Sequence, residues 1–93
     1  MKTTLVDQIS RDLNLDRRTL LSQGVRSFLK DRRRAVLLER LELLSRNGVA
    51  AEEELQRKIE TGEVADHPAW EDLIVLENLE AELQKIDGYL ERL

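Results

Sequence analysis

The apolar residues of this chain recur at helical spacings along most of its length. The clearest seam lies in residues 66–93, where they alternate at spacings of three and four: Leu76, Leu79, Leu83, Ile86, Leu90 and Leu93. This spacing is typical of a helix that packs along another helix. We therefore predict a long final helix that buries one face against the chain upstream of it.

A short helix is predicted near the beginning of the sequence. Its apolar residues share one face: Leu5, Val6, Ile9 and Leu13. Thr3 or Thr4 can cap this helix, with Asp7 close by in the manner of a capping box. The polar run Asn14-Leu15-Asp16 then interrupts the pattern and ends the helix.

A second, much longer helix is predicted from about Arg17 to Arg46, between a capping Asp16 and a stop at Asn47-Gly48. Its length would be roughly 45 Å at 1.5 Å per residue. Its apolar residues form two patches: Leu20, Leu21, Val25, Phe28 and Leu29 in the first, and Val36, Leu37, Leu38, Leu41, Leu43 and Leu44 in the second. A helix of this length exceeds what so small a domain could cover alone.

A third, shorter helix is predicted between Ala51 and Gly62, with three glutamates in its first turn that complement the helix dipole. The final helix then begins near Pro68, which is suited to a first helical position and pushes His67 toward an extended conformation. Trp70 follows at the start of the long seam. Two interpretations of it stay open, a core anchor or an anchor for a partner protein.

Composition favours helices over a thick core, because 37% of the 93 residues are charged and only 3% are aromatic. We predict one all-α domain over residues 1–93, in which the second and fourth helices form a long antiparallel hairpin, with short N-terminal and connecting helices. With no cysteine to staple a small core, oligomerisation is the simplest source of further stability. We therefore expect a dimeric helical bundle, or a larger oligomer.

The charge is distributed unevenly along the chain. Residues 1–46 carry 11 Lys/Arg and 6 Asp/Glu, a net charge of +5, whereas residues 47–93 carry 4 and 13, a net charge of −9. One explanation is that the basic and acidic halves attract each other across the hairpin. Another is that the basic half binds nucleic acid, for which the candidate phosphate contacts are Arg26, Arg32, Arg33 and Arg34.

Chemical motifs are absent from the sequence. The four glycines are dispersed, so there is no phosphate-binding loop, and the serines lack the surroundings of an activated nucleophile. The single His67 has no partner at metal-ligand spacing. We expect no enzyme activity, no cofactor and no metal. No apolar run could span a bilayer and the first residues are too polar for a secretory signal, so we expect a soluble cytoplasmic protein with no membrane partner.

Two stretches resemble known families. Residues 5–29, with a short helix, a turn and then a Leu-Leu and Val-Arg-x-Phe-Leu helix, resemble the two helices of ribbon-helix-helix proteins, many of which are antitoxins that repress their own operons. That family reads DNA with a strand ahead of the first helix, and here only Met1 to Thr4 precede it. The resemblance implies a DNA-binding transcriptional regulator that uses the basic half.

The second stretch runs from Glu54 through His67-Pro68-Ala69-Trp70-Glu71-Asp72 into the last helix, and is similar to the carboxyl-terminal part of small helical antitoxins of prokaryotic toxin–antitoxin operons. This resemblance implies a protein that neutralises a toxin by binding it. An acidic half suits toxins with basic, RNA-binding surfaces. The expected contact residues are Trp70, Glu71, Leu73, Ile74 and Glu77. A purely structural helical oligomer is the third hypothesis.

Overall fold

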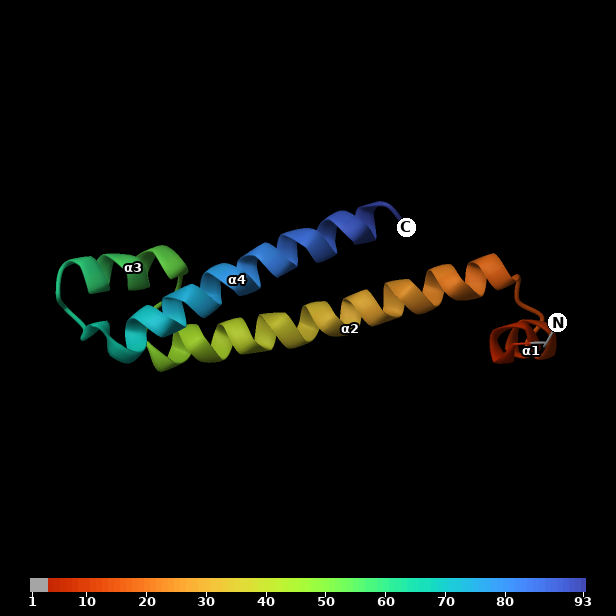
Figure 1. Cartoon of the computed structure of the whole chain (residues 1–93), viewed down its shortest axis with the longest axis horizontal. Helices are drawn as coiled ribbons and strands as arrows, with labels where there is room; N and C mark the ends of the chain where they lie inside the picture. The colour runs from red at the N-terminus through yellow and green to blue at the C-terminus, as the bar shows by residue number, and fades with distance from the viewer. Residues whose placement is uncertain (1–3) are drawn as a thin grey trace.

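The computed structural model describes residues 4–93, and every regular element in that range is an α-helix. The helices are α1 (Leu5–Asp12), α2 (Arg17–Arg46), α3 (Glu52–Glu60) and α4 (Asp66–Glu91), which confirms the predicted all-α fold. The molecule is elongated, measuring 63 × 21 × 21 Å. In Figure 1, α2 and α4 lie side by side as an antiparallel pair, α3 lies against α4, and α1 lies beside the far end of α2.

Local capping explains where the first two helices begin and end. The hydroxyl of Thr4 accepts a hydrogen bond from the backbone N–H of Asp7 at 3.1 Å, which is one half of the predicted capping box. The same hydroxyl donates a hydrogen bond to the Asp7 carboxylate at 2.8 Å. The alternative cap, Thr3, lies outside the described residues. Asp16 caps α2, and Gly48 follows its end with a φ of +65°, a conformation that glycine adopts without strain.

The start of α4 also follows the sequence. His67 has extended backbone angles, with φ −106° and ψ 135°, as expected of a residue that precedes proline. The regular helix therefore begins at Pro68. The His67 ring lies on the surface, with Nδ1 2.6 Å from a carboxylate oxygen of Glu71 one turn later.

The core lies where α2, α3 and α4 meet. Leu55 of α3 is fully buried, and the final-helix seam is buried from Leu76 to Ile86. The buried apolar residues are Val36, Leu43, Leu44, Val49, Leu55, Ala69, Leu73, Leu76, Leu79, Leu83 and Ile86. None of them precedes Val36. The core therefore occupies only the part of the molecule where α4 packs against α2 and α3.

Ion pairs connect α2 to α4 and fix their antiparallel register. Arg33, midway along α2, contacts Asp87 near the end of α4 at 2.8 Å, and Arg46 at the end of α2 contacts Asp72 near the start of α4. Two further pairs connect the same helices, Arg32 with Glu82 at 2.8 Å and Arg40 with Glu80 at 3.6 Å. The opposite charges of the two halves therefore meet across the hairpin.

The two long helices do not end together. A guanidinium nitrogen of Arg26 donates a hydrogen bond to the carbonyl oxygen of Leu93 at 2.9 Å, so the chain end reaches only that level of α2. Residues 17–25 of α2 extend beyond it by about 13 Å at 1.5 Å per residue. Along this extension α1 is the helix that packs against α2 (Figure 1).

Within residues 4–93, no helix combines the length and the apolar character needed to cross a membrane. The same residues contain no cluster of three or more histidine and carboxylate side chains placed to hold a metal ion.

Candidate protein-binding surfaces

Trp70 and Ile74 lie on the surface of α4, close to its start. Trp70 is 50% exposed and Ile74 is 42% exposed. Glu77 lies one further turn along, so the three residues form an i, i+4, i+7 row on one side of the helix. Glu71, beside Trp70, is exposed as well. We call Trp70, Glu71, Ile74 and Glu77 the acidic face. The sequence left open whether Trp70 is core or surface, and the structure places it on the surface.

Leu73, which the sequence analysis placed with these contact residues, is instead part of the core, with 2% of its surface exposed. It belongs to the row Ala69, Leu73 and Leu76, which has the same i, i+4, i+7 spacing but is displaced by one residue from the row of Trp70. Each residue turns an α-helix by about 100°. The row of Leu73 therefore packs inside the molecule while the row of Trp70 lies outside it, and Leu73 is not available to a partner.

The surroundings of Trp70 are strongly negative. Residues 63–80 contain six Asp/Glu and no Lys/Arg. Glu52, at the start of α3, lies close enough to this region to respond to it. Burial raises the pKa of the Glu52 carboxyl, and the nearby charges of Glu77, Glu53 and Glu80 raise that pKa further. The carboxylates at the start of α3 therefore lie close to those of Glu77 and Glu80 on α4.

Asp72 holds the start of α4 against the end of α2, a role that the sequence analysis did not assign. Its side chain is 7% exposed and accepts hydrogen bonds from Arg46 at 3.2 Å and Asn47 at 2.8 Å. Burial alone raises the pKa of this carboxyl. The hydrogen bonds and the guanidinium charge of Arg46 outweigh burial and leave the pKa below its ordinary value. The sequence signal was an aspartate directly before Leu73, a member of the buried row.

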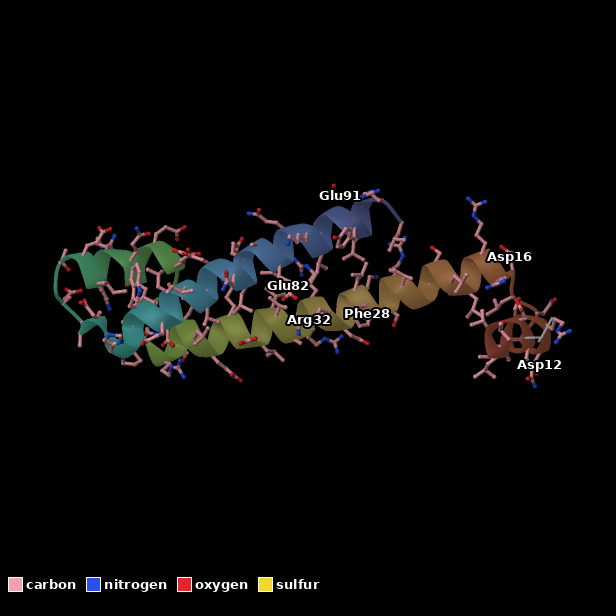
Figure 2. All side chains as sticks on the ribbon, in the orientation of Figure 1. Asp12, Asp16, Phe28, Arg32, Glu82 and Glu91 are labelled. Carbon is pink, nitrogen blue, oxygen red and sulfur yellow. The ribbon has the colours of Figure 1, made fainter. Side chains whose placement is uncertain are left out.

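A second surface lies at the other end of the molecule, around α1 and the extension of α2. It carries several exposed large apolar side chains. Six of them we call the apolar end: Leu5, Leu13, Leu21, Val25, Phe28 and Tyr89. Figure 2 labels Phe28 on α2, near the end of α4. Phe28 is 66% exposed and Leu5 is 70% exposed. These values are large for residues that a monomer would bury if it could.

Two hollows at the apolar end meet at Val25. One, of about 400 Å³, lies between α1 and α2, where Val6 and Ile9 face Leu21 and Phe28 across the position of Gly24. The other, of about 460 Å³, lies between α2 and the last turn of α4 and is lined by Val25, Leu29, Tyr89, Arg92 and Leu93. The apolar end is therefore one continuous, incompletely filled surface.

Comparison with known proteins places the chain in a family. The family model described as Uncharacterized protein MJ0235 family matches residues 1–93. The chain belongs to this family. No curated protein and no solved structure matches it. Because the family match spans the whole chain, the acidic face and the apolar end both lie inside the matched region of this MJ0235-family protein.

Three of the four candidate nucleic-acid contacts in this MJ0235-family protein point to α4. Figure 2 shows Arg32 and Glu82 between the two long helices, where both oxygens of Glu82 accept hydrogen bonds from Arg32. Arg33 pairs with Asp87, and Arg26 contacts the carbonyl of Leu93. Within residues 4–93, Arg34 alone of the four forms no ion pair or side-chain hydrogen bond. DNA binding through these arginines stays a prediction.

Proposed function

We propose that this protein is a binding module that neutralises a partner protein by covering part of its surface, as an antitoxin covers its toxin. The observation that carries the proposal is a half-exposed tryptophan in a stretch, residues 63–80, that has six Asp/Glu and no Lys/Arg. The similarity of residues 54–93 to antitoxins points to the same class of partner. The acidic face, rather than the basic half, is the contact surface in this proposal.

The physical case rests on what Trp70 and Ile74 gain by being covered. Tryptophan is enriched among the residues that dominate protein interfaces, because it removes a large apolar area from water at little cost in side-chain entropy. Neighbouring carboxylates favour a basic partner and speed its approach. Asp72 and Leu73 are buried next to this face and hold the start of α4 against the rest of the molecule. The acidic face therefore lies on a helix whose position is fixed by the core.

The experiment is growth of cells that express the neighbouring open reading frame, with and without this protein. We expect the neighbour to arrest growth, co-expression to restore it, and the two proteins to co-purify. In the variant Trp70→Ala/Ile74→Ala, rescue and co-purification should both be lost while the helical circular dichroism signal is retained, because both side chains lie outside the core.

The matched control is Leu38→Ala/Leu41→Ala, which removes two comparably exposed apolar side chains from α2. This control should rescue growth as well as the unaltered protein does. A neighbour that is harmless, or that arrests growth regardless of this protein, overturns the antitoxin proposal. Rescue that survives loss of Trp70 and Ile74 but not of Leu38 and Leu41 overturns the assignment to the acidic face.

A further inference from the structure

The apolar end lacks the burial that would hold α1 in place within one chain. α1 has eight residues and none of them is buried. Isolated helices shorter than roughly 12–15 residues are marginal in water, so α1 needs tertiary packing to persist. Yet its partner, the extension of α2, leaves Leu21 and Val25 about half exposed. Another surface must supply the missing packing.

The charges at this end are suited to a second copy of the chain. Residues 4–28 contain four arginines and three aspartates, a net charge of +1 with both signs interspersed. In a two-fold interface each patch meets its own copy, so a nearly neutral patch suffers little repulsion. The acidic face, with the exposed carboxylates of Glu71 and Glu77 and no Lys/Arg in residues 63–80, would repel its own copy. A highly charged foreign partner, in turn, finds no complementary field at the apolar end.

The exposed area is also of the right order. An aromatic side chain offers about 150–250 Å², so Phe28 and Tyr89, at 66% and 50% exposure, leave on the order of 200 Å² uncovered. Leu5, Leu13 and Leu21 and the hollow around Val25 extend this surface. A stable interface buries roughly 800 Å² on each partner, and a contiguous apolar patch of several hundred Å² marks an interaction site.

We propose that two chains associate through their apolar ends about a two-fold axis. In this dimer α1 and residues 17–28 of each chain fill the hollows of the other, and the four helices together form the core that neither chain has alone. The acidic faces then lie at opposite ends of the dimer, each free to bind a partner. This self-association does not depend on the function proposed for Trp70.

Sedimentation velocity over a range of protein concentrations provides the first test. We expect the unaltered chain to be dimeric at micromolar concentrations and above. Phe28→Glu should raise the dimer dissociation constant by at least about tenfold, because the axis places two buried carboxylates in one interface. The matched control is Leu41→Glu, which places the same charge on an equally exposed position of α2 outside the apolar end and should remain dimeric.

Single cysteines provide the second test, since the chain has none of its own. Gly24 lies in the hollow with open space around the position of a Cβ atom, so Gly24→Cys should join two chains through a short bismaleimide linker. Glu63→Cys, exposed beyond the end of α3, lies at the far end and should give no linked dimer.

Several results would overturn the proposal. A chain that stays monomeric up to hundreds of micromolar would do so, as would a dimer that Leu41→Glu dissociates and Phe28→Glu does not. Linkage through Glu63→Cys but not through Gly24→Cys would place the contact at the wrong end. Because Phe28 lies outside the core, retained helical circular dichroism in Phe28→Glu separates loss of association from loss of folding.

Discussion

The two ends of the molecule expose apolar side chains for different reasons. At the acidic end, Trp70 and Ile74 are exposed on a helix whose opposite side is buried against two others. At the apolar end, Leu21 is exposed because α2 extends past α4 and meets only a short helix, and Phe28 is exposed close to where α4 ends. Exposure on top of a formed core indicates a surface that is kept for another molecule. Exposure where no core exists is the basis of our proposal that a second chain completes this end.

The charges strengthen this contrast. Residues 63–80 carry six Asp/Glu and no Lys/Arg, a balance that would favour a basic partner over a second copy, whereas residues 4–28 are almost neutral. Ion pairs between α2 and α4 neutralise part of the charge along the hairpin, including two of these six carboxylates, Asp72 and Glu80.

The largest effect is expected from Leu55→Ala at the acidic end. Leu55 is fully buried and connects α3 to the core, so its truncation should lower the free energy of unfolding by about 2–5 kcal/mol at any protein concentration. Leu21→Ala at the apolar end should change it by less than about 0.5 kcal/mol in dilute solution, where the chain is a monomer and Leu21 is half exposed. Urea unfolding monitored by circular dichroism measures both.

The comparison becomes sharper when the same titrations are repeated at high concentration. Leu21→Ala should then lower the free energy of unfolding by a larger amount. The reason is that, in the proposed dimer, association stabilises the unaltered chain more than it stabilises the variant. The control is Leu41→Ala, which truncates an exposed leucine outside the apolar end. Its effect on the free energy of unfolding should stay near zero at both concentrations. An equal cost for Leu21→Ala at both concentrations would contradict the view that this end is completed by a second chain.

The next effect concerns Asp72, which fastens α4 to the end of α2. Removing a buried acceptor of charged hydrogen bonds should lower stability by about 1–3 kcal/mol in Asp72→Ala at neutral pH. The control is Asp31→Ala, an exposed aspartate of α2, which should stay within about 0.5 kcal/mol of the unaltered chain.

The cost of losing Asp72 should depend on pH in a defined direction. Its pKa is lower in the folded chain than in the unfolded chain, where an aspartate titrates near 3.9. The stabilisation is therefore complete above the unfolded value and is lost as pH falls through the folded value. The stability difference between the unaltered chain and Asp72→Ala should shrink below about pH 4. A difference that grows on acidification would contradict the assigned hydrogen bonds.

Much of this fold could be predicted from the sequence because helix ends depend on local chemistry. Asp16 and Gly48 set the bounds of α2 through a side-chain cap and a left-handed turn, both of which involve only near neighbours. Side-chain burial could not be predicted in the same way. The start of α4 is apolar around most of its circumference, so periodicity alone could not decide whether the row of Trp70 or that of Leu73 faces α3.

Which charged residues pair depends on the register between α2 and α4. That register is set by the conformation of residues 47–65, which connect the two helices. The uneven charge of the two halves indicated that α2 and α4 attract each other. The uneven charge could not indicate which carboxylate of α4 is buried. The structure shows that it is Asp72, which pairs with Arg46. Likewise the excess length of α2 was evident from its caps, but the level at which α4 stops, and hence the apolar end, required the structure.

A smaller effect is expected for the ion pair that lies between the two ends. Arg32→Ala should lower stability by about 0.2–1 kcal/mol, because both Arg32 and Glu82 remain partly exposed to solvent. Arg34→Ala, two residues along the same helix and without an ion pair within residues 4–93, should have no measurable effect. A double-mutant cycle with Glu82→Ala isolates the coupling. A coupling energy of zero would show that the pair sets register without contributing stability.

The smallest effect is expected from salt on self-association. The apolar ends are nearly neutral, so raising ionic strength should leave the dimer dissociation constant within about a factor of two, or tighten it slightly as salt strengthens apolar burial. Binding of a basic partner to the acidic face should weaken over the same range, because salt screens the attraction between opposite charges. Sedimentation at low and high salt tests the first statement. A dimer that dissociates in salt would instead be held by contacts between the basic and acidic halves of different chains, which places the interface along the hairpin and removes the distinction between the two ends.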